Sequence, residues 1–283
     1  MMGKIKIGLV LVCVALLAGC AGVKEQNALQ AVPEIRPGFL QGYLPVDMLP
    51  NSLTLIPPPP AEGSTAFALD REVNRQSHAL QGTARWNLAK RDARLKFPQA
   101  AETFSCALGL PISEAETPHL YMLLRRTIAD AILSTTKAKN HYRRTRPFVL
   151  NGEPTCTPTK EAHMKKSGSF PSGHTAIGWA WALILVEVAP EQTDAILARG
   201  WAFGQSRIIC NVHWQSDVLM GQVMGAAAVA KLHSDPAFLA EIEAAKAEVQ
   251  ALRAKALPLT VDCKGEAAAL SENLPLASWP ANR

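Results

Sequence analysis

The sequence predicts an all-α protein, a single compact helical bundle preceded by a proline-rich tether. From residue 64 onward, apolar residues recur every three or four positions, which is the period of an amphipathic helix. Residues 174–188 are almost wholly apolar and are followed by Pro190, which predicts a helix buried on all sides. No stretch shows the convincing apolar alternation that indicates a strand. These observations favour helices packed around one buried helix.

The N-terminus has the pattern of an export signal. Lys4 and Lys6 precede an apolar stretch at 7–18, which is too short to span a bilayer comfortably. The stretch ends in the string LAGC, whose cysteine is Cys20, and this string resembles a bacterial lipobox. We therefore expect residues 1–19 to be a lipoprotein signal peptide and Cys20 to carry the lipid. The alternative is an ordinary secretory signal with a chance cysteine.

Prolines dominate the following segment, residues 20–62. They prevent regular helix and favour extended chain, so we expect a tether here. Some of its apolar residues are candidates for packing against the domain, namely Tyr43, Leu44, Met48, Leu53 and Leu55. The helical domain is then expected over 63–257, with a C-terminal tail at 258–283.

The helices of this domain follow from periodicity, prolines and glycines. A first helical stretch at 64–92 contains Gly82 as a possible break, and a helix from 117 begins with Pro118 in its first turn. The expected helices cover 64–92, 98–108, 117–139, 174–188, 191–209, 215–233 and 236–255, with a loop at 143–170. No later apolar run reaches 18 residues, so no second membrane segment is expected.

The charge is mildly positive. Without the two lysines of residues 1–19, the formal net charge falls from +5 to +3. This balance suits an anionic substrate. It does not indicate a nucleic-acid partner, because no run of basic residues is interleaved with aromatic residues.

Three short motifs carry the chemistry. They are Lys139 with Arg146-Pro147, then Pro171-Ser172-Gly173-His174, then Ser206-Arg207 with His213 and Asp217. Arginine and lysine supply charge-assisted bonds to phosphate oxygens, and a Ser-Gly turn at a helix start offers free N–H groups to an anion. One histidine remains to attack phosphorus and the other to protonate the leaving oxygen. A carboxylate one helical turn after His213 can orient its ring.

Each motif alone has a simpler interpretation. The first is typical of a solvated basic turn, the second of a helix N-cap without chemistry, and the third of a surface salt-bridge face. Their joint occurrence in this order, with 23 residues between the first two and 31 between the last two, favours one phosphate site.

The pattern resembles the phosphatidic acid phosphatase type 2 superfamily, which also contains the vanadium haloperoxidases. The strings KNHY at 139–142, GSFPSGHT at 168–175 and GQSR at 204–207 resemble the class A bacterial non-specific acid phosphatases in particular. The resemblance covers residues 70–246. It departs at Phe170, where that family usually has tyrosine. The lost hydroxyl could alter substrate preference but removes none of the catalytic groups.

The motifs and the resemblance together give each residue a role. The resemblance implies that His213 is a nucleophile forming a phosphohistidine, with Asp217 accepting its other ring N–H. We expect His174 to protonate the leaving oxygen, a step that contributes on the order of 10²–10⁴ in rate. The residues expected to bind phosphate are Lys139, Arg146, Ser172, Gly173 and Arg207. No metal or other cofactor is expected, because the motifs contain no carboxylate cluster for Mg²⁺ or paired Zn²⁺.

Besides Cys20, four cysteines remain after the signal: Cys106, Cys156, Cys210 and Cys263. In an oxidising compartment they suggest two disulfides, with three possible pairings. No C-x-x-C spacing is present, so a structural zinc site is not expected. Because the first and third motifs must meet at one phosphate, Cys156–Cys210 is the favoured pair, which leaves Cys106–Cys263.

Residues beside the motifs are given simpler roles. We expect His141 to make local hydrogen bonds, with a substrate contact as the alternative. Arg143 and Arg144 are expected to be solvated, with an outer role in attracting phosphate as the alternative.

The sequence thus favours a metal-independent, broad-specificity phosphomonoester hydrolase that is exported and lipid-anchored. We expect the anchor in a bacterial membrane, with the outer membrane as the favoured one. The catalytic domain is expected to face the periplasm or the cell exterior. The expected partners are small phosphomonoesters, the membrane and a possible second copy of the chain. The alternatives are a phosphate-binding surface lipoprotein, a lipid-phosphate phosphatase and a vanadate haloperoxidase.

Overall fold

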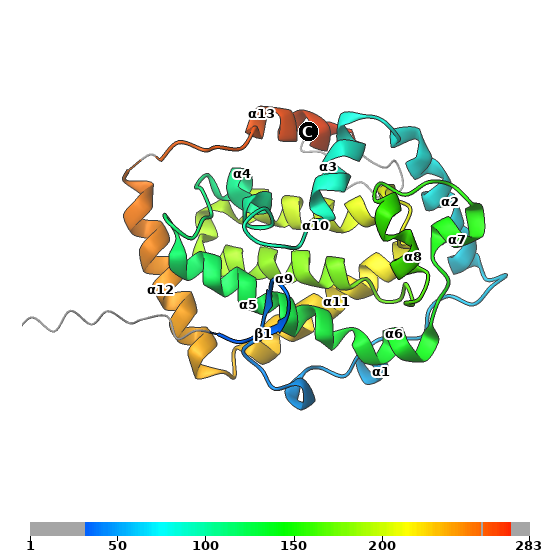
Figure 1. Ribbon diagram of the computed structural model, residues 1–283, viewed down its shortest axis with the longest axis horizontal. Helices are drawn as coiled ribbons and strands as arrows, with labels where there is room; N and C mark the ends of the chain where they lie inside the picture. The colour runs from blue at the N-terminus through cyan, green and yellow to red at the C-terminus, as the bar shows by residue number, and fades with distance from the viewer. Residues whose placement is uncertain (1–31, 256, 273–283) are drawn as a thin grey trace, which may run out of the picture. The chain divides into compact units, whose positions relative to one another are not determined.

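Helix α9 (Gly173–Val188) lies among the other long helices (Figure 1). The computed structural model describes residues 32–255 and 257–272, so the predicted signal peptide and Cys20 lie outside the described residues. Helices α5 (Pro118–Ser134), α10 (Thr193–Ile209), α11 (Gln215–Leu232) and α12 (Pro236–Arg253) all pack against α9. The all-α prediction is confirmed, with the apolar stretch as the central helix.

The remaining elements are short. They are α1 (Ser52–Leu55), α2 (Thr65–Ser77), α3 (Ala84–Asp92), α4 (Ser105–Leu108), α6 (Thr136–Tyr142), α7 (Pro147–Asn151), α8 (Glu161–Met164) and α13 (Cys263–Ser271), with 3₁₀ turns at Val46–Met48, His78–Leu80, Ala101–Phe104, Pro158–Lys160 and Pro190–Gln192. The expected break at Gly82 separates α2 from α3, and its φ of +77° is a value that glycine adopts readily. The helix expected over 117–139 is divided at Thr135 into α5 and α6.

The core of the domain surrounds α9. Its side chains Ile177, Trp181 and Ile184 are at most 1% exposed. The indole Nε1 of Trp181 donates to the carbonyl of Leu124 on α5 at 2.9 Å, which satisfies its polar group inside the core. An apolar surface on every side of α9 therefore explains why helices surround it.

The segment predicted as a tether packs on the domain from Pro33 onward. Strands β1 (Glu34–Arg36) and β2 (Phe39–Leu40) form an antiparallel pair that the sequence did not indicate. Among the five apolar candidates, Tyr43 and Leu44 are buried, whereas Met48, Leu53 and Leu55 are exposed. The backbone N–H groups of Tyr43 and Leu44 donate to the Asp130 carboxylate on α5 at 3.0 and 2.9 Å. These contacts join residues more than 80 positions apart, so local propensity could not reveal them.

The cysteines and the C-terminal segment complete the domain. Both favoured disulfides, Cys106–Cys263 and Cys156–Cys210, are present. Part of the expected tail forms α13, which begins at Cys263 and packs against α3. Within the described ranges no helix is both long and apolar enough to cross a membrane.

Candidate active site

The three motifs meet at one place, although they lie on different elements. Lys139 is on α6, and Arg146 is the residue before α7. Ser172 is the N-cap of α9, Arg207 is in the last turn of α10, and His213 and Asp217 flank the start of α11. The loop between α10 and α11 is only five residues long, so it brings Arg207 and His213 to the same end of the bundle.

Lys139 is held by backbone oxygens of the second motif. Its Nζ donates to the carbonyls of Gly168, Ser169 and Pro171 at 3.0, 3.3 and 2.7 Å. Burial and the nearby Arg146 lower the pKa of Lys139 to about 7, against an opposing effect of Asp217. The ammonium therefore needs a nearby anion to keep its charge above neutral pH.

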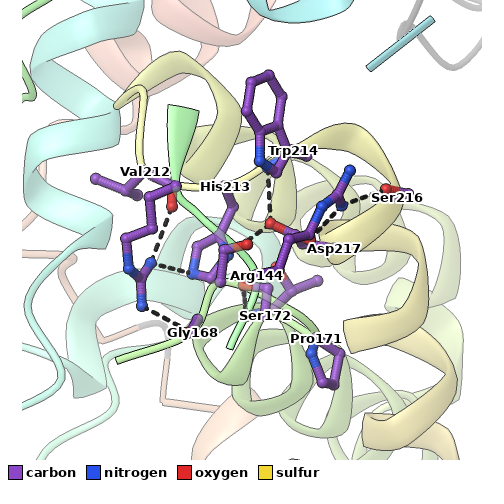
Figure 2. A network of polar contacts seen from close by, with 12 residues as sticks. Arg144, Gly168, Pro171, Ser172, Val212, His213, Trp214, Ser216 and Asp217 are labelled. Carbon is purple, nitrogen blue, oxygen red and sulfur yellow. Dashed lines mark hydrogen bonds and ion pairs between the residues drawn. The ribbon is translucent and has the colours of Figure 1, made fainter. Parts of the chain in front are cut away.

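Arg146 connects the first motif to His213. Its Nη1 donates to the Val212 carbonyl at 2.9 Å and lies 3.2 Å from His213 Nε2. Its Nη2 donates to the Gly168 carbonyl at 3.2 Å (Figure 2). Burial lowers the pKa of Arg146 to about 10, so the guanidinium remains charged at acid and neutral pH.

Arg207 is a buried cation without full compensation. Its side chain belongs to the core at 2% exposure, and among the described residues nothing bonds its Nε or Nη1. Burial and Arg146 lower its pKa to about 10, with Asp92 acting in the opposite direction. Buried polar groups are normally paired, and each unpaired donor of a charged group is costly. Two nitrogens without partners on a buried guanidinium are therefore available to bond anionic oxygens.

His213 lies between an acceptor and a donor, as Figure 2 shows. Its Nδ1 lies 3.3 Å from Asp217 Oδ2, and its Nε2 faces Arg146. A carboxylate only accepts and a guanidinium only donates, so the ring carries its proton on Nδ1 and a lone pair on Nε2. Burial, followed by Arg146, Lys139 and Arg207, holds the pKa of His213 well below its usual value. This shift favours the neutral form of the ring.

His174 has a different environment at the first turn of α9. Its Nε2 lies 3.5 Å from the Ala93 carbonyl, and Lys160 Nζ lies 3.4 Å from the same oxygen. Burial, Arg207, His213 and Lys160 keep the pKa of His174 well below its usual value. A bound phosphate would offset those cations and favour the protonated ring.

The Ser172-Gly173 turn begins α9. The Ser172 hydroxyl accepts from Thr175 N at 3.3 Å and from Thr175 Oγ1 at 2.9 Å, so it caps the helix. The Ser172 N–H donates to the Asp217 carbonyl at 2.9 Å, which ties the second motif to the third. Gly173 is the first residue of the helix, where backbone N–H groups have no partner within the helix.

Comparisons with known proteins show the family of this chain. The PAP2 superfamily model matches residues 118–237, which include all three motifs. A non-specific acid phosphatase of Providencia stuartii is 44% identical over 212 residues, covering 75% of this chain and 86% of that protein. The chain belongs to the class A bacterial non-specific acid phosphatases of the PAP2 superfamily.

Two further relatives agree with this placement. An acid phosphatase of Zymomonas mobilis is 39% identical over 220 residues, or 77% of this chain and 83% of the relative. A non-specific acid phosphatase of Salmonella typhimurium is 42% identical over 189 residues, or 66% of this chain and 76% of the relative.

The expectation that Arg144 is solvated was wrong for this acid phosphatase. Its side chain is 8% exposed and bonds Asp217 Oδ1 at 2.6 Å and Asp70 Oδ2 at 2.7 Å. Sequence analysis also missed Asp70. A signal existed, because Asp70, Asn74 and Ser77 share the buried stripe of α2 with Val73. Polar residues on the buried face of a helix indicate a polar network.

Sequence analysis also missed a second network, which lies between α3 and α10 next to Arg207. Arg199 binds Asp92 through both terminal nitrogens, and the Ser206 hydroxyl donates to Asp92 Oδ2 at 2.6 Å. Arg85 donates to Ser206 Oγ at 3.0 Å. This network joins α3 to α10 one residue before Arg207 and so fixes the position of that cation.

Two motif-flanking residues of the acid phosphatase, Phe170 and His141, pack against Tyr142. Phe170 is 1% exposed, and its ring meets Tyr142 edge-on at 5.8 Å, so the site of the missing hydroxyl lies in the core. His141 is exposed and contacts the Tyr142 ring. These contacts give both residues a packing role.

Proposed function

We propose that this acid phosphatase is a metal-independent, broad-specificity phosphomonoester hydrolase that works through a phosphohistidine at His213. The observation that carries the proposal is buried Arg207, whose Nε and Nη1 have no partner among the described residues. Beside it lie Lys139, Arg146 and the lone pair of His213 Nε2, which faces Arg146. A phosphoryl group would supply the missing negative charge and leave phosphorus facing the nucleophile.

In the first step the Nε2 lone pair attacks phosphorus, and the bond from phosphorus to the ester oxygen breaks. The leaving oxygen takes a proton from His174. Lys139, Arg146 and Arg207 balance the charge on the three equatorial oxygens throughout. Asp217 stabilises the ring, which keeps its Nδ1 proton and becomes cationic on phosphorylation.

In the second step water attacks phosphorus and gives its proton to His174, while the phosphorus–nitrogen bond breaks. His213 recovers its lone pair and inorganic phosphate leaves. The same residue acts first as acid and then as base, which microscopic reversibility permits.

The electrostatics of the site suit acid conditions. The low pKa of His213 keeps the nucleophile unprotonated, while Lys139, with a pKa of about 7, is charged below neutrality. Both conditions hold together only on the acid side of neutral pH. Broad specificity is supported because the motif residues recognise the phosphoryl group and not the alcohol.

Rapid quench with ³²P-labelled substrate tests the mechanism. Alkaline handling, which preserves phosphohistidine, should leave label at His213. His213→Ala should abolish labelling and turnover for every substrate. Label at Ser172 or His174 contradicts the assignment.

Metal independence is part of the proposal and has its own test. In the described ranges no three His, Cys, Asp or Glu side chains cluster in a way that would hold a metal ion. Activity should survive prolonged EDTA treatment and dialysis. Loss of activity that a divalent ion restores contradicts metal independence.

We also propose that Cys20 is lipidated and anchors the enzyme to a bacterial membrane, with the outer membrane as the favoured one. The catalytic domain then faces the periplasm or the cell exterior. The support is the LAGC string after a short apolar stretch with lysines before it. Cys20→Ser should release active enzyme from membranes. A variant that still fractionates with membranes after a salt wash contradicts the anchor.

A further inference from the structure

A guanidinium behind the active site is held between two buried carboxylates. Arg144 Nη1 bonds Asp217 Oδ1 at 2.6 Å, and Arg144 Nη2 bonds Asp70 Oδ2 at 2.7 Å. The exposed fractions of the Asp70 and Asp217 side chains are 2% and 0%. The cluster therefore holds two negative charges and one positive charge out of contact with solvent.

Ser216 closes the cluster between Asp70 and Arg144. Its N–H and hydroxyl donate to the two oxygens of Asp70 at 2.8 and 2.5 Å. Its Oγ accepts from Arg144 Nη1 at 2.7 Å (Figure 2). Asp70 comes from α2, far along the chain, so the cluster fixes α2, the first motif and the start of α11 together.

Both oxygens of Asp217 are occupied. Oδ1 accepts from Arg144, whereas Oδ2 accepts from the Trp214 N–H at 2.9 Å and faces His213 Nδ1 at 3.3 Å. A carboxylate bonded on both sides cannot rotate, so the histidine ring is held in one orientation. Arg144 thus contacts Asp217, the partner of His213, directly.

The charge of Asp70 matters because Arg144 alone would neutralise Asp217. Apart from Asp217, the groups near His213 are cationic or neutral: Arg146, Lys139, Arg207 and His174. When the His213 ring is phosphorylated, Asp217 has to stabilise its positive charge against these cations. By pairing with the other side of Arg144, Asp70 leaves Asp217 with more of its negative charge available to the ring.

We propose that Asp70 is a positioning residue of the active site, which acts through Arg144 to orient Asp217 against His213 Nδ1 and to preserve the negative charge that stabilises the phosphorylated ring. The inference rests on the proposed phosphohistidine mechanism. Neither Asp70 nor Arg144 is placed in contact with substrate.

Two variants should shift the pH profile in opposite directions. Asp70→Asn removes a negative charge, so protonated His213 becomes less stable and the acid limb of kcat/KM moves down by about half a pH unit. Arg144→Gln removes a positive charge, so that limb moves up by about as much. The double variant should lie between them, because the two substitutions have opposite electrostatic effects.

The kinetic constants give a second readout. Asp70→Asn should lower kcat about tenfold and change KM less than about twofold, because the phosphate-binding cations are untouched. Asp235→Asn is the matched control. Asp70 accepts from the Ser216 N–H in the first turn of α11, and Asp235 likewise accepts from the Phe238 N–H in the first turn of α12. It should change neither kcat nor the pH limb.

A purely structural role predicts a different result. A loosened, wetter site would raise KM and move the limb of both variants toward higher pH. The inference would be overturned if the acid limb of kcat/KM stayed in place in folded variants, or if it moved in the same direction in both. Either variant alone tests the sign if the other does not fold, as judged by thermal melting. Label missing from His213 of the parent enzyme would instead overturn the proposed mechanism.

Discussion

The two active-site histidines differ in what surrounds each ring. His213 has a carboxylate at Nδ1 and a guanidinium at Nε2, which fixes a nucleophilic tautomer. His174 faces a backbone carbonyl that it shares with Lys160, and among the described residues no carboxylate bonds its ring. The ring with the carboxylate partner is the one suited to carry a positive charge through a covalent intermediate. The other ring is suited to move a proton.

This difference predicts a selective defect in His174→Ala. A good leaving group such as p-nitrophenolate scarcely needs a proton, whereas an alkoxide does. Turnover of p-nitrophenyl phosphate should fall about tenfold and that of glycerol phosphate about a thousandfold, within the range of general acid catalysis. Steady-state kinetics on both substrates measures the ratio. His141→Ala, which alters an exposed histidine, is the control and should change neither rate. Equal losses on both substrates would contradict the acid role.

At the scale of elements, the contact between α9 and α11 positions the Ser172-Gly173 turn. A Cβ at Gly221 would lie 2.6 Å from the Ser172 carbonyl, and one at Gly225 would lie 2.5 Å from the Ala176 carbonyl. The two helices approach closely because both positions lack a side chain. The Gly221 contact meets the turn itself, whereas the Gly225 contact lies one helical turn further along α9.

These two glycines form a matched pair of tests. Gly221→Ala and Gly225→Ala should each lower the free energy of unfolding by about 1–3 kcal/mol through overpacking. Only Gly221→Ala should also raise KM, because it displaces Ser172 and Gly173. Urea denaturation and steady-state kinetics measure the two effects. A KM increase of similar size in Gly225→Ala would show that the effect is not local to the turn.

The N-terminal segment depends on one buried carboxylate of α5. Burial raises the pKa of Asp130 to about 6 from 3.8, even though the N–H groups of Leu44 and Tyr43 favour the charged form. A raised folded-state pKa gives stability that is complete below the unfolded pKa and lost as pH rises to about 6. The contribution of Asp130 to the free energy of unfolding is therefore largest under acid conditions.

Asp130→Asn should reveal this dependence. Relative to the variant, the parent should gain about 2–3 kcal/mol of unfolding free energy between pH 7 and pH 3.5, since each pKa unit corresponds to about 1.4 kcal/mol. Urea denaturation at the two pH values measures the difference. Asp262→Asn, at the exposed N-cap of α13, provides the control and should show no such gain. A constant difference across pH would contradict the raised pKa.

At the scale of the whole molecule, the two disulfides have different tasks. Cys106–Cys263 joins residues 157 apart and attaches α13 to the domain. Cys156–Cys210 joins residues 54 apart and connects the loop after Arg146 to the residue that follows α10. Only the second lies between residues of the candidate site.

Replacing each pair by serine should separate stability from catalysis. Loss of either disulfide should cost about 2–5 kcal/mol of unfolding free energy, mostly through the unfolded chain. Removal of Cys106 and Cys263 should leave kcat intact below the melting temperature, whereas removal of Cys156 and Cys210 should lower it. Thermal melting and initial rates measure both. Equal effects on kcat would contradict this division.

The sequence by itself determined the helical fold, the buried helix and the motif residues that the structure brings together in the candidate site. Periodicity and prolines are local signals, so they locate α9, α10 and α11 within a few residues. The motif residues could be predicted because phosphate requires a particular set of cations, donors and histidines in any arrangement. The favoured disulfides followed from the same requirement that the motifs meet.

Only the tertiary structure decided which residues support that site. Asp70 and Ser216 are 146 residues apart, and Asp130 and Tyr43 are 87 apart. Arg144 looks solvated in the sequence because its two carboxylate partners come from other helices. For the same reason the sequence predicted a tether and a C-terminal tail but not the strand pair or α13. A buried charge acquires its role from groups that folding brings to it, and local propensity contains no record of those long-range contacts.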